Sequence, residues 1–196
     1  HVSSGGQKTE GFSIAQNWDP DNCYQQISTA AVMATMSDTI LIDYGIHPYH
    51  NSNTLPALIA NRDMSNDNSN TSVVLRAYSR FLLNPNQQSS EIRGITFTAE
   101  DIESNRPLFD LAPEDDSLDY FLISSCRFFN LNSSSQGADI EIGGGVVRAQ
   151  PNTGYSVIRI SNSEFIHNYC RGDGGAIAIA DGWNVIISGS NFIGNH

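Results

Sequence analysis

Five acidic residues in the second half of the chain have side chains suited to acid–base catalysis: Asp139, Glu141, Glu164, Asp173 and Asp181. Cleavage of a glycosidic bond uses two carboxylates that flank the scissile bond. None of the five lies in a pattern that resembles the catalytic signature of a polysaccharide-cleaving enzyme. Isolated acidic side chains are usually solvated rather than catalytic. The sequence therefore predicts no catalytic residue.

Histidines are the next candidates, because His1 could join His47, His50 or His167 in a copper-binding histidine brace. Removal of a signal peptide explains a chain that begins at His1 more simply, and it predicts secretion. The sequence contains no glycine-rich phosphate loop, calcium-loop pattern or Ser/His/Asp signature. It therefore predicts no metal ion and no cofactor.

The tripeptide Arg171-Gly172-Asp173 has the form of an integrin-recognition sequence. It immediately precedes Gly174 and Gly175, where a tight turn favours the same residue types. A structural turn is the simpler interpretation of this segment.

The three cysteines, Cys23, Cys126 and Cys170, have no CxxC spacing that would indicate a zinc or redox site. A disulfide between Cys126 and Cys170 is one hypothesis, and buried free thiols are the other. Asn70 and Asn132 each begin an Asn-x-Ser triplet, the form of an N-glycosylation acceptor in a eukaryotic protein.

The charge balance bears on the class of partner. The formal net charge is −11 and the pI is near 4.6, so the phosphate backbone of a nucleic acid would be repelled. No apolar run approaches the roughly 20 residues that a membrane-spanning helix needs. The sequence predicts neither nucleic-acid binding nor membrane insertion of this segment.

An internal repeat is the main organising feature of the chain. Three segments align without gaps, and a fourth keeps their outer apolar positions: Ile123–Phe128, Ile160–Phe165, Ile187–Phe192 and Ile92–Phe97. A recurring local pattern with irregular spacing is typical of a solenoid, whose insertions emerge as loops. The phenylalanines of these segments, Phe97, Phe128, Phe165 and Phe192, are expected to stack in successive turns.

A second motif alternates with the first. Glycines precede a short strand at 143–149 and again at 174–180, with Gly145 equivalent to Gly175, and a glycine such as Gly174 allows a tight corner. Asn168 and Asn195 follow their phenylalanines by three residues and are expected to form a ladder of amide hydrogen bonds. Each turn of the solenoid therefore carries at least two strands.

The N-terminal part has a different character. Residues 23–36 predict a short helix with one apolar face, formed by Ile27, Ala30, Ala31 and Ala34. A strand is expected at 39–43. Residues 1–50 are interpreted as an N-terminal cap, because an uncovered first coil would expose strand edges and core.

Residues 51–196 are predicted to form the coils themselves. Polar composition indicates loop excursions at about 51–72 and 99–119. The last coil has no capping segment before His196, so the coils are expected to continue beyond residue 196 or to stack on another subunit.

The motifs Phe165-Ile-His-Asn168 and Phe192-Ile-Gly-Asn195, which alternate with Gly174-Gly-Ala-Ile177, resemble the FxxN and GGA[I/L/V] repeats of chlamydial polymorphic membrane proteins and other autotransporter passengers. The helix and first strand look like the entry to a pectin-lyase-like β-helix. The resemblance implies an all-β fold, a right-handed single-stranded parallel β-helix with an N-terminal capping helix.

The predicted function is that of a non-enzymatic secreted or cell-surface protein, adhesin-like or a structural component of an extracellular assembly. The expected partners are other protein subunits, with end-to-end stacking into a filament, or a host or matrix surface of protein or carbohydrate. The long loops are the expected contact surfaces. The alternative is a polysaccharide lyase or glycoside hydrolase, because the pectin-lyase-like superfamily that the chain resembles includes such enzymes.

Overall fold

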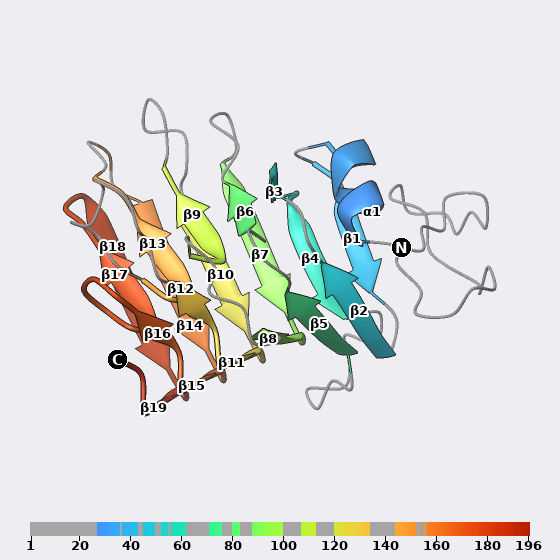
Figure 1. Cartoon of the computed structure of the whole chain (residues 1–196). Coiled ribbons are helices and arrows are strands. Elements are labelled where there is room, and N and C mark those ends of the chain that lie inside the picture. Colours follow the sequence, from blue (N-terminus) through green and yellow to red (C-terminus); the bar gives the residue numbers. More distant parts are fainter. Residues whose placement is uncertain are drawn as a thin grey trace.

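The structure is a computed structural model. It describes residues 27–35, 37–42, 45–49, 52–54, 56–61, 71–75, 80–82, 88–99, 107–112, 120–133, 144–151, 154 and 156–196. These residues form helix α1 (Ile27–Met33) and strands β1 to β19. Figure 1 shows the strands side by side in rows, with α1 at one end of the rows and the C-terminus at the other.

Sheet A contains six parallel strands from successive stretches of the chain. In their order across the sheet they are β1 (Thr39–Ile42), β4 (Leu58–Asn61), β7 (Ser89–Arg93), β10 (Tyr120–Ser124), β14 (Ser156–Ser161) and β18 (Trp183–Ser188). Side chains alternate between the two faces of a strand. Ile92, Ile123 and Ile160 occupy the same register in neighbouring strands and are all fully buried. One face of sheet A is therefore a wall of the hydrophobic core.

Sheet B contains six further parallel strands. They are β2 (Gly45–Tyr49), β5 (Thr71–Leu75), β8 (Thr96–Ala99), β11 (Arg127–Phe129), β15 (Glu164–Ile166) and β19 (Asn191–Ile193). The phenylalanines of the repeat stack in register on its inner face. Ring centroids are 5.3 Å apart between Phe97 and Phe128, 4.8 Å between Phe128 and Phe165, and 4.6 Å between Phe165 and Phe192. The repeated phenylalanine thus forms one continuous column.

Sheet C is a third parallel sheet, with five strands: β3 (Ser52–Thr54), β6 (Arg80–Leu82), β9 (Phe109–Leu111), β13 (Val147–Ala149) and β17 (Ile177–Ile179). Two more strands, β12 (Asn132–Ser133) and β16 (Tyr169–Cys170), pair with each other alone. Aromatic side chains of sheet C meet those of sheet B inside the molecule, where Phe109 lies edge-on to Phe97 and Phe128.

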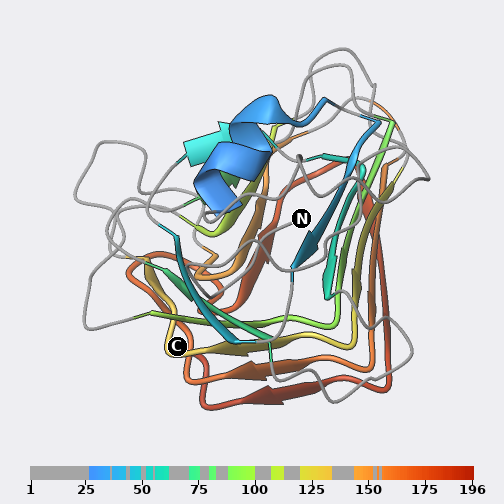
Figure 2. The same cartoon turned by 90° about the vertical axis from the view of Figure 1, so that its right-hand side faces the viewer.

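The chain passes through sheets A, B and C in turn, and each pass adds one strand to each sheet. We call one such pass a rung. Six rungs are described, and the sixth consists of β18 and β19. Figure 2 shows the strands of sheets A and B lying behind one another, with a corner between the two sheets. The protein is therefore all-β, built from parallel sheets, as the sequence predicted.

The corner between sheets A and B explains the third position of the repeat. Gly94, Ser125, Asn162 and Gly189 occupy it, with φ values of 65°, 52°, 49° and 57°. This left-handed conformation excludes bulky and β-branched residues and is adopted most easily by glycine and asparagine. The backbone N–H groups of Gly94, Ser125 and Asn162 also bond to the next rung, as from Asn162 to the carbonyl of Ser188 at 3.0 Å. The small residue in the repeat is therefore a requirement of backbone geometry.

Helix α1 lies against β1, β2 and β3 of the first rung. Its predicted apolar face is confirmed, because Ile27, Ala30 and Ala31 are buried in the core and Ala34 packs against it. The helix ends at Met33, and the turn that follows is closed by the N–H of Thr35, which donates to Asp38 Oδ2 at 2.6 Å. The predicted first helical residues, 23–26, lie outside the described residues.

The boundary expected at residue 50 falls inside the first rung. Strand β1 pairs with β4, and β2 pairs with β5, so both belong to the sheets rather than to a separate cap. The regular rungs therefore begin at Thr39, and α1 is the described element that precedes them.

The segments expected to be loops contain strands. β3 and β4 lie within 51–72, and β9 lies within 99–119. Ile59 and Ala60 in β4 are buried because β1 and β7 flank them on both sides. Tertiary pairing overrides the local polar composition here, as is common for β-structure. The remaining parts, 62–70, 100–106 and 113–119, lie outside the described residues.

Candidate functional site

The asparagines of the repeat are structural. Asn168 is fully buried and accepts a hydrogen bond from the N–H of Leu131 at 3.1 Å. Its amide nitrogen donates to the carbonyl of Phe128 at 3.1 Å and to Asn195 Oδ1 at 2.9 Å. Asn195 in turn donates to the carbonyl of Phe165 at 2.8 Å. The two asparagines form the expected ladder, and Leu131 takes the place of asparagine one rung earlier.

The glycines of the second motif allow close backbone contact between rungs. The N–H of Gly145 donates to the carbonyl of Gly175 at 3.0 Å, and a Cβ on Gly145 would collide with that carbonyl oxygen. Gly174 has a φ of 67°, which L-residues with side chains rarely adopt. Backbone packing therefore accounts for all three glycines. None of them has a side chain that could act in catalysis or binding.

The hypothesis of a disulfide between Cys126 and Cys170 is wrong, because both are free and buried. Cys126 lies at the corner that precedes β11, where its Sγ is 3.5 Å from the carbonyl oxygen of Ile92. Cys170 ends β16, which follows β15, so the two thiols lie at opposite ends of the sheet B strands. Disulfide geometry requires the two Cα atoms within about 7 Å. The third cysteine, Cys23, lies outside the described residues.

Burial raises the pKa of the Cys126 thiol from 9.0 to about 12. The unfolded thiol ionises at lower pH than the folded one, so its contribution to stability is present below pH 9 and is lost as pH rises toward 12. We expect the wild type to lose about 1.4 kcal/mol more per pH unit above pH 9 than Cys126→Ser. Urea unfolding of both proteins at several pH values measures this difference. Parallel pH profiles would contradict the assignment.

The carboxylates considered for catalysis do not come together. Glu164 lies on the outer face of sheet B and forms an ion pair with Arg127, with Nε and Oε2 2.6 Å apart. Asp173 and Asp181 are exposed in turns that flank β17. Asp139 and Glu141 lie outside the described residues. The described residues therefore hold no pair of these carboxylates.

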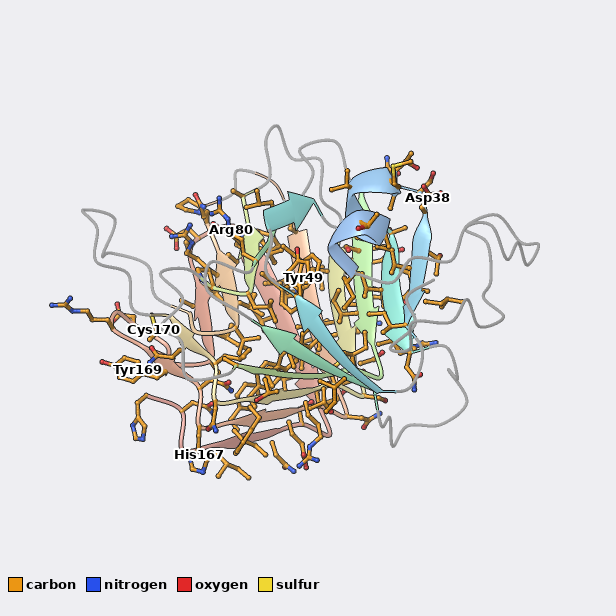
Figure 3. The ribbon with its side chains drawn as sticks, turned by 45° about the vertical axis from the view of Figure 1, so that its right-hand side comes forward. Asp38, Tyr49, Arg80, His167, Tyr169 and Cys170 are labelled. Atoms are coloured by element: carbon orange, nitrogen blue, oxygen red, sulfur yellow. The ribbon has the colours of Figure 1, made fainter. Side chains whose placement is uncertain are left out.

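A charged cluster that the sequence did not reveal crosses three rungs of sheet C. Asp110 is almost completely buried and accepts hydrogen bonds from Arg148, from Nε to Oδ1 at 2.9 Å and from Nη2 to Oδ2 at 2.5 Å. Gln150 donates to Asp110 Oδ1 at 3.0 Å, and Arg80 lies 3.8 Å away on the other side. Figure 3 labels Arg80 in this region. The buried carboxylate of Asp110 is therefore paired with arginine and hydrogen-bonded.

One local signal marks Asp110. It stands between Phe109 and Leu111, which are fully buried, so the alternation of the strand directs the carboxylate to the opposite face. Its partner could not be inferred, because Arg148 comes into register only through the pairing of β9 with β13.

The outer face of sheet B combines polar and apolar groups. A groove of about 400 Å³ runs along the corner with sheet A. It is lined mainly by polar side chains, among them Ser125, Arg127, Asn162, Ser163, Glu164 and Asn191. Two residues further along the same strands lie Phe129, Ile166 and Ile193, in one register. This face therefore places hydrogen-bonding groups beside an apolar column.

Exposed aromatic side chains lie on this face and beyond the corner that His167 forms between β15 and β16. Phe129 is 40% exposed, and His167 lies edge-on to it with ring centroids 6.4 Å apart. Tyr169 is 44% exposed in β16. Figure 3 shows His167 and Tyr169 at the outside of the molecule, while Tyr49 lies in the interior. We call Phe129, Ile193, His167 and Tyr169 the outer aromatic surface.

Comparison with protein-family models, with curated proteins and with solved structures gave no match for this chain. Its function must therefore be inferred from its own geometry. Among the described residues, no three His, Cys, Asp or Glu side chains are grouped to hold a metal ion. In the same part of the chain, no helix is long and apolar enough to cross a membrane.

The structure describes only some of the remaining predicted positions. Asn132 lies in β12 with its Oδ1 buried and without a hydrogen-bond partner in the described ranges, whereas Asn70 lies outside them. Arg171 and Asp173 are exposed in the turn between β16 and β17. His1 and His50 lie outside the described residues, so the structure does not test the histidine brace.

Proposed function

We propose that this chain is a right-handed parallel β-helix with a non-enzymatic, adhesin-like or structural role on a secreted or cell-surface protein. Successive strands of each sheet are parallel and are separated by a pass through the other two sheets. Crossovers between parallel strands of one sheet are right-handed in nearly all proteins, which supports the hand. In such a fold the inner side chains are committed to stacking, so recognition falls to the outer faces and loops.

The outer aromatic surface carries the functional part of the proposal. Exposed aromatic side chains that lie near one another are typical of surfaces that contact a protein or a sugar. The polar groove beside it supplies hydrogen-bonding groups. In contrast, Glu164 beside this surface forms an ion pair with Arg127 and not a pair with another carboxylate. This arrangement favours binding over hydrolysis.

Binding of the purified chain to immobilised extracellular-matrix proteins and glycans tests the proposal. We expect retention on at least one such surface, and a loss of about tenfold or more in affinity for Phe129→Ala combined with Tyr169→Ala. Val32→Ala is the matched control, because Val32 is 66% exposed on α1, away from this face. Equal binding by both variants would contradict the assigned surface.

Incubation of the same protein with pectin and alginate tests the enzyme alternative. We expect no release of reducing or unsaturated sugars. Turnover by the wild type that is lost in Glu164→Gln would overturn the non-enzymatic role and establish a polysaccharide-active enzyme.

A further inference from the structure

A short charged turn separates β16 from β17 in the fifth rung. It contains the tripeptide Arg171-Gly172-Asp173, whose two charged side chains are both exposed. Figure 3 shows Tyr169, two residues before Arg171, at the outside of the molecule. The tripeptide therefore lies beside the outer aromatic surface, to which Tyr169 belongs.

The fourth rung holds this turn at both ends. Before the turn, Cys170 pairs with Ser133 of β12. After the turn, the carbonyl of Gly175 accepts a hydrogen bond from the N–H of Gly145 at 3.0 Å. Only residues 171–174 lie between these two fixed points. A segment that is already held in place loses less conformational freedom when it binds a partner.

Backbone geometry explains the glycine after the tripeptide but not the tripeptide itself. Gly174 has a φ of 67°, and a Cβ there would collide with the carbonyl oxygen of Ile177. Gly172, in contrast, does not have a positive φ, so the turn does not require glycine at this position. The requirements of the turn therefore leave the tripeptide unexplained.

The two charges of the tripeptide are not used within the described part of the fold. Elsewhere on the surface an arginine pairs with a carboxylate, as Arg127 does with Glu164 at 2.6 Å. Among the residues that the structure describes, neither Arg171 nor Asp173 forms an ion pair or a side-chain hydrogen bond. Both side chains are therefore available to a partner.

Side chains that point outward from this fold stay exposed even where another rung follows. Phe129 points outward from β11, which has β8 on one side and β15 on the other, and it is still 40% exposed. In β16 the outward side chain is Tyr169, and the inward one is Cys170, which is 6% exposed. Arg171 continues this alternation on the outward side. Its exposure therefore follows from its direction.

We propose that this turn binds an integrin-type receptor, whose divalent cation takes the Asp173 carboxylate and whose acidic pocket takes the Arg171 guanidinium. A carboxylate oxygen is a preferred ligand of Mg²⁺ and similar hard cations. A guanidinium binds a carboxylate through two parallel hydrogen bonds. Gly172 places no side chain between the two charges. The inference rests on the proposed adhesin-like role and names a partner for it.

Binding to the purified ectodomain of an integrin that recognises Arg-Gly-Asp ligands tests the proposal, with surface plasmon resonance in Mn²⁺ as the measurement. We expect the immobilised chain to bind and the signal to disappear in EDTA. Asp173→Glu should lower the affinity at least about tenfold, because glutamate keeps the charge but moves the carboxylate one methylene further from the backbone. Asp181→Glu is the matched control and should bind like the wild type, because Asp181 is exposed in the turn that follows β17.

A soluble Gly-Arg-Gly-Asp-Ser peptide should compete with the wild-type chain, which tests the same site without any substitution. The proposal is overturned by an absence of binding in Mn²⁺, by binding that persists in EDTA, or by equal affinities of Asp173→Glu and Asp181→Glu. Retention on matrix proteins or glycans is measured without integrin and depends on Phe129 and Tyr169. Failure of the receptor assay is therefore distinguishable from failure of the adhesin-like role.

Discussion

Phe128→Ala is expected to lower the free energy of unfolding by about 3–5 kcal/mol, measured by urea denaturation. The side chain is fully buried, and its ring stacks on Phe97 at 5.3 Å and on Phe165 at 4.8 Å. It also meets Phe109 edge-on at 6.0 Å. Truncation would leave a cavity at the point where the aromatic columns of sheets B and C meet. Rings on both sides restrict the collapse that could fill it.

Phe192→Ala is the matched control, because it removes the same side chain from the end of the phenylalanine column instead of from its middle. Phe192 stacks on Phe165 alone and is 42% exposed, so its loss should cost about 1 kcal/mol or less. The difference between the two variants measures what a second neighbouring rung contributes. Equal losses would contradict the contribution assigned to stacking between two rings at Phe128.

Asp110→Ala is expected to destabilise the chain by about 3–5 kcal/mol, because it removes the counter-ion of a largely buried arginine. The side chain of Arg148 is only 17% exposed and makes two hydrogen bonds to this carboxylate. Replacing both partners by apolar residues, as in Asp110→Leu with Arg148→Met, should recover part of the loss. Urea unfolding of the single and double variants gives the coupling between the two charges.

Glu164→Ala provides the exposed counterpart. The Glu164 and Arg127 side chains are 37% and 61% exposed, so their ion pair should contribute about 0–1 kcal/mol. If Asp110→Ala lowers the free energy of unfolding as little as Glu164→Ala does, Asp110 is solvated. The charged cluster would then not stabilise the fold.

Local sequence patterns were sufficient to predict the positions whose structure depends only on residues nearby in the chain. The repeat at 123–128, 160–165 and 187–192 could be aligned because each copy meets the same backbone requirement at its corner residue. The apolar face of α1 could be read because helical periodicity depends only on near neighbours. Both predictions are confirmed by the structure.

Positions that depend on non-local pairing could not be read in the same way. β4 and β9 lie in segments whose polar composition predicts loops, yet neighbouring rungs make them strands. The free state of Cys126 and Cys170 also depends on where the rungs place the two thiols, which their spacing does not reveal.

The sequence by itself determined the repeat, its corners and the stacked phenylalanine and asparagine positions, because each copy has the same residue types at the positions that face the same local backbone geometry. The tertiary structure alone decided which outward side chains meet. Asp110 and Arg148 are distant in the chain and come together only through the register of β9 and β13. The same holds for the outer aromatic surface, since exposure is a property of neighbours rather than of residue type.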